Sequence, residues 1–153
     1  IVFCDILPIL RKPELFNELI KEMSNSKSVQ ESEALLAIDA RGFIFGTALA
    51  QLTKKPVVLA RKPGKLPGET IEASYDLEYG KNTLCIQKSS IDPFESFSII
   101  DDLLATGGTA ACVEKMLLSS NKKVKSLSVV VELPFLNGRK SLDCEVNSVV
   151  KLD

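Results

Sequence analysis

The pattern of hydrophobic and polar positions along this chain predicts helices that alternate with short buried strands. Apolar residues recur at helical spacing over residues 13–23, 42–52 and 108–119. Short apolar runs typical of buried strands lie at residues 34–38, 56–60, 98–100, 127–133 and 146–152. Strands that alternate with helices predict an α/β fold, with a mostly parallel five-stranded sheet flanked by helices.

The remaining segments have less regular patterns. Residues 24–32 are polar and predict a loop, and residues 61–68 form a basic segment rich in Pro and Gly. Residues 69–87 mix polar and apolar positions around Gly80, which predicts a β-hairpin. We find no linker or internal repeat, so residues 1–153 are expected to form a single domain.

Composition places the chain among ordinary globular proteins. It has 153 residues, of which 45% are hydrophobic and 25% are charged. The net charge of −1 argues against a general surface for nucleic acid or membrane. No apolar run approaches the roughly 20 residues that cross a bilayer. Because the chain starts at Ile1 and not at Met, we expect a truncated N-terminal segment.

The cysteine and histidine content narrows the chemistry. Four cysteines are scattered without a CxxC pair, and there is no His. This pattern argues against a zinc site and predicts reduced thiols in a cytoplasmic protein. The absence of His also excludes Ser-His and Cys-His nucleophile pairs. Chemistry must therefore rest on carboxylates, Lys and Arg, backbone dipoles or a metal ion.

The most informative stretch runs from residue 97 to residue 109. An apolar run is followed by Asp101 and Asp102, then by a small-residue loop and a helix. Backbone N–H groups of such a loop and the helix N-terminus would point at one spot, which suits a phosphate. The two acids suit the hydroxyls of an attached sugar, although such a pair also occurs at solvated strand ends. No Lys follows the glycines, so this is not a Walker loop.

The run Ile-Ile-Asp-Asp-Leu-Leu-Ala-Thr-Gly-Gly-Thr at residues 99–109 resembles the signature of type I phosphoribosyltransferases, which bind phosphoribosyl pyrophosphate (PRPP). Other stretches resemble the adenine phosphoribosyltransferases, and they lie at residues 2–8, 39–46, 61–68, 74–80 and 132–139. The resemblance covers essentially the whole chain. It implies Mg²⁺-dependent conversion of adenine and PRPP into AMP and pyrophosphate in purine salvage. It also implies the type I phosphoribosyltransferase fold and a homodimer without nucleic-acid or membrane partners.

The same resemblance implies that several loops bind PRPP. Their residues are Asp39, Ala40, Arg41, Arg61, Lys62, Lys65, Asp101, Asp102, Ala105, Thr106, Gly107, Gly108 and Thr109. Arg41 offers a fork for pyrophosphate oxygens, and the family often has a cis peptide between the positions of Asp39 and Ala40. The basic cluster of Arg61, Lys62 and Lys65 would neutralise the charge of pyrophosphate in this subunit or in a partner subunit. The alternative is a solvated charged turn. Mg²⁺ would bind mainly through PRPP and waters, with Asp101 and Asp102 as candidate contacts.

The resemblance also implies a mobile hood, residues 69–87, that closes over the site and excludes water. Glu78 would handle a proton at the purine, because no His is present. Tyr79 would orient the pyrophosphate or the nucleophile, and Arg41 completes the implied catalytic set. The alternative is an exposed hairpin with ordinary side chains, an interpretation that suits Tyr75 better than Glu78.

Adenine recognition is implied at two places in the chain. Phe3 would stack on the purine, while backbone groups of Val2, Cys4 and Leu133 would read its edge. Many family members have Arg where Cys4 stands, which would lower turnover if that Arg side chain helps to close the site. The related 6-oxopurine enzymes tend to use a Lys and an aromatic residue after the fourth strand. Residues 132–134 contain neither.

Two other functions remain open from the residues alone. One is a PRPP- or nucleotide-binding regulator on the same fold, and the other is a transferase for another base such as xanthine or orotate. The presence of Glu78 and Arg41 argues against a regulator without catalysis. The matches at Val2, Phe3 and Leu133 favour adenine over other bases.

Overall fold

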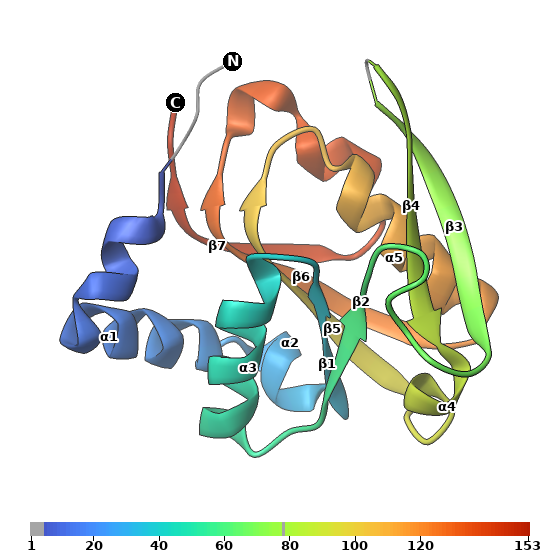
Figure 1. Cartoon of the computed structure of the whole chain (residues 1–153). Helices are drawn as coiled ribbons and strands as arrows, with labels where there is room; N and C mark the ends of the chain where they lie inside the picture. Colours follow the sequence, from blue (N-terminus) through green and yellow to red (C-terminus); the bar gives the residue numbers. More distant parts are fainter. Residues whose placement is uncertain (1–4, 78) are drawn as a thin grey trace.

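Five parallel strands form the centre of the computed structural model, which describes residues 5–77 and 79–153. The strands run in the order β2–β1–β5–β6–β7 and pair in parallel throughout (Figure 1). Their bounds are Ala34–Ile38 for β1, Val57–Ala60 for β2, Ser96–Leu104 for β5, Lys123–Glu132 for β6 and Glu145–Lys151 for β7. The parallel five-stranded sheet that the alternating pattern predicts is therefore confirmed.

Helices cover both faces of this sheet (Figure 1). Helices α1 (Pro13–Ser24) and α3 (Gly42–Thr53) pack on the face that contains Leu35 and Ile100. Helix α5 (Gly108–Ser119) packs on the opposite face. Successive strand residues point to opposite faces, and both faces of these strands are apolar, so each layer of helices has its own hydrophobic core.

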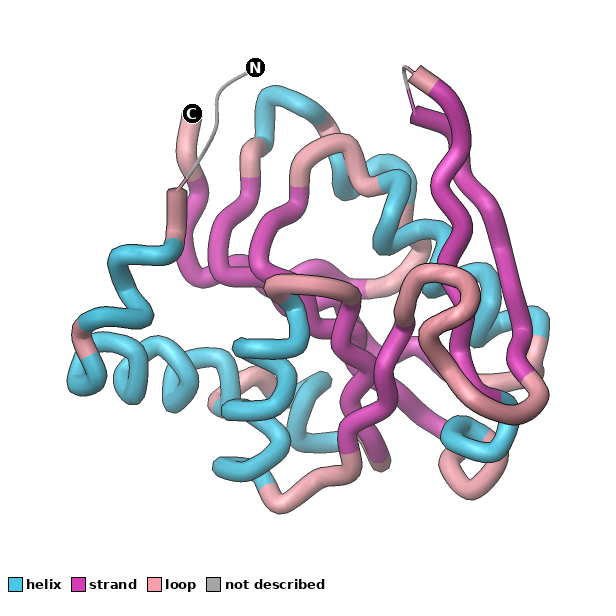
Figure 2. The backbone as a smooth tube through the Cα atoms, viewed as in Figure 1, coloured by secondary structure: helices cyan, strands magenta, loops and turns pink. Residues whose placement is uncertain are grey.

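The hood, residues 69–87, is a two-stranded antiparallel sheet. Strand β3 (Thr70–Leu77) pairs with β4 (Gly80–Gln87), and the turn falls just before Gly80, as the sequence predicts. At its base, Arg61 and Cys85 exchange backbone hydrogen bonds of 2.9 and 2.7 Å, which attach β4 to the chain that leaves β2. In Figure 2 the tip of the hood stands on the same side of the molecule as the loops that follow β5 and β6.

Strand β5 is longer than its sequence pattern indicates. The apolar run predicts a strand over residues 98–100, whereas β5 continues to Leu104. The reason is its neighbour β6, which pairs with β5 as far as Leu104 and Glu132. Asp101 and Asp102 therefore lie inside the last part of the strand, and the expectation that they follow its end is wrong.

Short helices are the other difference from the predicted elements. They are η1 (Leu7–Arg11), α2 (Lys27–Glu31), α4 (Lys88–Ile91), η2 (Pro134–Leu136) and η3 (Gly138–Ser141). Helix α2 replaces the loop predicted over residues 24–32, and the Ser26 side chain caps it by accepting the Val29 N–H at 3.5 Å. A helix of about one turn with a single buried Val is too short to show a helical period in the sequence. No helix in the described ranges is long and apolar enough to span a membrane.

Gly46 allows α3 to lie directly on β1. A Cβ atom at position 46 would lie 2.6 Å from the Cβ of Ala37, well inside van der Waals contact. In an exposed helix, Gly→Ala stabilises by up to about 1 kcal/mol. Here we expect Gly46→Ala to lower the free energy of unfolding by about 1–3 kcal/mol, because the added methyl overpacks the core.

Urea denaturation followed by circular dichroism measures this difference. Thr47→Ala is the matched control, because Thr47 is the next residue of the same helix and is exposed. Thr47→Ala should change the free energy of unfolding by no more than about 0.5 kcal/mol. A Gly46→Ala protein as stable as the unmodified chain would contradict the proposed close contact.

Candidate active site

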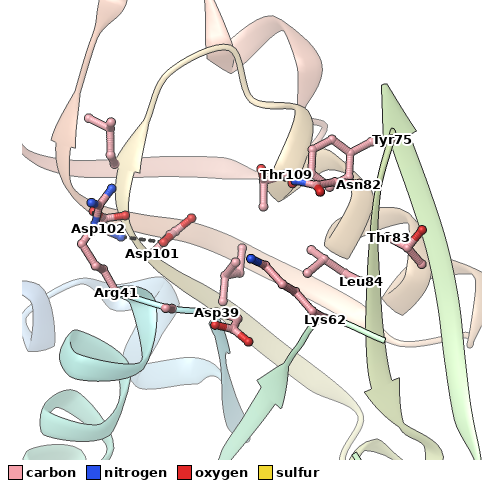
Figure 3. A pocket seen from close by; sticks show the side chains of 13 residues that line it. Asp39, Arg41, Lys62, Tyr75, Asn82, Thr83, Leu84, Asp101, Asp102 and Thr109 are labelled. Carbon is pink, nitrogen blue, oxygen red and sulfur yellow. Dashed lines mark hydrogen bonds and ion pairs between the residues drawn. The ribbon is translucent and has the colours of Figure 1, made fainter. Parts of the chain in front are cut away.

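A pocket of about 410 Å³ lies between the carboxyl ends of β1 and β5 and the hood. Its lining combines acidic, basic and hydroxyl side chains from six segments of the chain (Figure 3). The lining residues are Ile38, Asp39, Ala40, Arg41, Lys62, Tyr75, Asn82, Thr83, Leu84, Asp101, Asp102, Leu103 and Thr109. Ligands of parallel sheets gather at this edge, so the pocket is the candidate active site.

Two ion pairs organise the floor of the pocket. The Arg41 Nε donates to Asp102 Oδ2 at 2.5 Å, and the Arg61 Nε donates to Asp39 Oδ2 at 3.3 Å. Asp102 is buried, while the Arg41 side chain remains 45% exposed. Since only the Nε of Arg41 is engaged in this bond, its two terminal nitrogens remain to meet a ligand. The peptide bond between Asp39 and Ala40 is cis, as the resemblance implies.

Asp101 and Asp102 both line the pocket, where Asp102 is buried and Asp101 is partly buried. The Asp102 backbone N–H donates to Asp101 Oδ1 at 2.8 Å, which holds the Asp101 carboxylate against the backbone of the next residue. Burial raises the pKa of Asp101 well above its ordinary value, and the negative charge of Asp102 raises this pKa further. A cation or a hydroxyl donor in the pocket would stabilise this pair.

The predicted basic cluster is only partly brought to the pocket. Lys62 lines it, and the Arg61 guanidinium lies 5.8 Å from the ring centroid of Phe43. Lys65 is exposed in the loop that follows β2 and does not line the pocket. Tyr79, in the hood turn, is 94% exposed and does not line the pocket either. Among the predicted residues, Val2, Phe3, Cys4 and Glu78 lie outside the described ranges.

The loop at residues 105–109, which we call the phosphate loop after the ligand that the resemblance implies, surrounds a second pocket of about 80 Å³. Ala105, Thr106, Gly107, Gly108 and Thr109 all line it, next to the first turn of α5. Asp101, Leu103 and Thr109 line both pockets, so the small one adjoins the large one. Backbone N–H groups at a helix N-terminus give this small pocket the character of an anion site.

Gly107 and Gly138 let the phosphate loop lie against the loop that follows β6. Gly107 has a φ of 89°, and a Cβ there would lie 2.6 Å from the Gly138 carbonyl oxygen. A Cβ at Gly138 would in turn overlap the Ala105 carbonyl oxygen. The Ser141 hydroxyl donates to the Thr106 carbonyl at 3.0 Å. The two loops therefore fix each other's positions.

An ion pair between the buried Glu132 and the exposed Arg139 holds the loop after β6 in place. Arg139 donates to both carboxylate oxygens of Glu132, from Nε at 2.6 Å and from a terminal nitrogen at 2.8 Å. The Ser148 hydroxyl adds a third donor at 2.7 Å. The hydrogen bonds from Arg139 lower the pKa of Glu132 to about 2, against the opposing effect of burial.

Leu133, the predicted backbone contact to adenine, has both of its backbone groups in hydrogen bonds. Its N–H donates to the Leu104 carbonyl at 2.9 Å, and its carbonyl accepts the Leu136 N–H at 3.1 Å. The Leu133 side chain is buried. A carbonyl oxygen has two lone pairs, so the Leu133 carbonyl can still accept one donor, whereas its N–H is occupied.

Sequence reasoning missed several residues of this region. Tyr75 and Asn82 line the pocket from the hood, and Glu132 and Arg139 hold the neighbouring loop. The stretch 132–139 contributes to the family resemblance, but nothing in its spacing pairs Glu132 with Arg139, because η2 lies between them and Arg139 is itself part of η3. For Tyr75 the only indication is its place on the same side of β3 as Ile71 and Ala73.

Several proteins of known identity share this architecture. No protein-family model matches the chain. An adenine phosphoribosyltransferase of Prochlorococcus marinus is 56% identical over 151 residues, which are 99% of this chain and 88% of that protein. The crystal structure of adenine phosphoribosyltransferase from Thermoanaerobacter pseudethanolicus matches with a TM-score of 0.93 at 40% identity, covering 99% of this chain and 89% of that one.

A third relative was crystallised with ligands. It is the adenine phosphoribosyltransferase of Saccharomyces cerevisiae, complexed with an imino-altritol bisphosphate and adenine. Its TM-score is 0.91 at 36% identity, with 98% of this chain and 88% of that chain covered.

The Glu132–Arg139 pair predicts a pH-dependent contribution to stability. Because the folded-state pKa of Glu132, about 2, lies below its ordinary value of 4.5, the contribution is present above pH 4.5 and is lost as the pH falls through about 2. We expect Glu132→Gln to lower the free energy of unfolding by about 1–3 kcal/mol at pH 7. The difference between the two proteins should shrink as the pH approaches 2.

Denaturation at a series of pH values checks this, with Glu145→Gln as the control because Glu145 is an exposed acid on β7. A Glu132→Gln effect that is equal at pH 2.5 and pH 7 would argue against the ionised pair as its cause.

Proposed function

The chain belongs to the adenine phosphoribosyltransferase family, and from this premise we propose that it transfers the phosphoribosyl group of PRPP to adenine, releasing AMP and pyrophosphate, as an enzyme of purine salvage. The observation that carries the proposal is the joined pair of pockets. A small anion site at the phosphate loop opens into a larger pocket lined by carboxylates and cations. A molecule with a phosphate at one end and a pyrophosphate-bearing ribose at the other matches both.

In this proposal the two ends of PRPP have separate binding groups. The phosphate loop holds the 5′-phosphate with its backbone N–H groups and the hydroxyls of Thr106 and Thr109. The terminal nitrogens of Arg41 bind pyrophosphate, and Lys62 adds a positive charge from the loop after β2. Arg61 and Lys65 contribute to the positive potential around the pyrophosphate. Lys65 does so in this subunit's site or in the site of a partner subunit.

The two carboxylates of the pocket suit the ribose and its metal ion. Asp101 and Asp102 accept the 2′- and 3′-hydroxyls or water molecules of a bound Mg²⁺. The oxygen donors and the raised pKa of Asp101 fit a hard cation, which would offset the repulsion between the two acids. In the described part of the chain no three His, Cys, Asp or Glu side chains gather to hold a metal alone. When bound, Mg²⁺ would neutralise charge on the departing pyrophosphate.

Transfer requires that adenine lie next to the anomeric carbon of the ribose. The bond from that carbon to pyrophosphate breaks as the bond to the purine nitrogen forms, and the positive charge that develops on the ribose is stabilised by nearby anionic groups. Phe3 with the backbone of Val2, Cys4 and Leu133 is proposed to hold the base. Glu78 then accepts the purine proton, and Tyr79 reaches the site only when the hood closes.

We also propose a homodimer in the cytoplasm. Exposed apolar side chains of α1 and α3, namely Leu15, Ile44 and Leu52, lie on neighbouring helices and support a self-association face. In the described part of the chain Cys85, Cys112 and Cys144 are free thiols, which is typical of proteins from a reducing compartment.

Formation of AMP from adenine, PRPP and Mg²⁺ tests the function. We expect turnover that selects adenine over hypoxanthine, guanine and xanthine, and a fall of about 10²-fold or more in kcat for Glu78→Ala. Tight PRPP binding without turnover for any base would instead indicate a regulator. Turnover with another base alone would indicate a different transferase.

Lys62 tests the assignment of the pyrophosphate end. Loss of one charge-assisted contact should raise the KM for PRPP about tenfold in Lys62→Ala. Lys123→Ala is the matched control, because Lys123 is exposed at the amino end of β6, whereas the pocket lies at the carboxyl ends of the strands. If both variants bind PRPP equally, Lys62 does not contact the ligand.

A further inference from the structure

Tyr75 connects the hood to the phosphate loop by a direct hydrogen bond. The Thr109 hydroxyl donates to the Tyr75 Oη at 2.9 Å, and the side-chain amide of Asn82 donates to the same oxygen at 3.2 Å. Figure 3 shows Tyr75 and Asn82 side by side next to Thr109. The Tyr75 ring lies over Gly108, where an added Cβ would lie 3.4 Å from the ring carbon Cδ2.

Below Tyr75 the hood is firmly packed. Ile71, Ala73 and Tyr75 share the inner side of β3 and pack against the core around α5. On β4, Leu84 and Ile86 are buried. The two strands of the hood therefore have a fixed base that extends from their attachment up to the level of Tyr75.

Beyond Tyr75 the hood is exposed. Tyr75 pairs across the two strands with Asn82, and residues 76–77 and 79–81 beyond this pair are all exposed. We call these exposed residues the hood tip. The Tyr75–Asn82 pair thus lies at the boundary between the packed base and the tip, and it is in contact with the phosphate loop.

We propose that Tyr75 is a positioning residue that couples occupation of the phosphate loop to the hood tip. This inference rests on the proposed function, in which the Thr109 hydroxyl binds the 5′-phosphate. A Thr hydroxyl has one proton to donate, and without ligand Thr109 donates it to Tyr75. A charged phosphate oxygen is the stronger acceptor, so the bound ligand takes this proton.

The change at Thr109 reverses its hydrogen bond with Tyr75. Once Thr109 donates to phosphate, its oxygen is free to accept, and the Tyr75 hydroxyl rotates to donate to it. Asn82 then donates to Tyr75, Tyr75 to Thr109 and Thr109 to phosphate, all in one direction. Hydrogen bonds aligned in this way polarise and strengthen one another. Filling the loop therefore ties the boundary of the hood tip more firmly to the site.

Amide hydrogen exchange of peptides spanning residues 76–81 tests the coupling, with the full chain and ribose 5-phosphate as the probe. In the unmodified protein we expect the probe to slow exchange there about threefold or more. Tyr75→Phe removes the hydroxyl and keeps the ring, so this slowing should disappear. Calorimetry should show that the Kd for ribose 5-phosphate changes less than about threefold, and kcat should fall more than the KM for PRPP rises.

Ser74→Ala is the matched control. It removes another hydroxyl from β3, one that is 2.7 Å from the Thr83 hydroxyl and has no contact with the phosphate loop. The response of the hood tip should survive this change.

Three results would overturn the proposal. If Tyr75→Phe retains the slowed exchange, the coupling is absent while the proposed function stands. If Tyr75→Phe weakens the binding of ribose 5-phosphate by the same factor as it reduces the slowing of exchange, Tyr75 is a binding contact and not a positioning residue. If the unmodified protein does not bind ribose 5-phosphate, the phosphate assignment of the loop fails and the coupling fails with it.

Discussion

The backbone contact between the phosphate loop and the loop after β6 is the constraint on which the site depends. Gly107 and Gly138 meet without side chains between them, so neither loop can shift alone. The Glu132–Arg139 pair fixes one of these loops to the end of β6, and Ser141 links it to Thr106. The phosphate loop and Leu133, the proposed backbone contact to adenine, therefore keep a set separation. Reactions between two bound molecules depend on such fixed geometry.

The second constraint is electrostatic. The described pocket holds the acids Asp39, Asp101 and Asp102 together with cations, and Arg41 and Arg61 are each paired with an acid in the free molecule. These pairs orient the guanidinium groups before any ligand arrives. A phosphorylated sugar supplies anions for the cations and hydroxyl donors for the acids, so it complements both halves of the pocket. An anion without hydroxyl groups, or a neutral sugar, would satisfy only one half.

The sequence predicts the sheet, its main helices and the loops of the site, because each has a periodicity or a local motif. It does not predict the length of β5, since that depends on pairing with β6, a partner distant in the sequence. It also does not predict that Lys65 and Tyr79 lie outside the pocket while Tyr75 lines it. Which side of a hairpin faces the site depends on how the hairpin packs on the domain, and alternation alone leaves both sides equivalent.

The division of the hood into a packed base and an exposed tip reconciles two requirements of the proposed reaction. Groups that contact the substrate must be held to a fraction of an ångström, which favours rigid elements. The site must also open for substrates and close against water, which favours a movable segment. Leu84 and Ile86 hold the base of β4 against the core, whereas Tyr79 lies almost fully exposed beyond it. The boundary between base and tip falls at Tyr75, which contacts the phosphate loop. The hydrogen bond between Thr109 and Tyr75 therefore holds the end of the packed base at the point where the exposed tip begins.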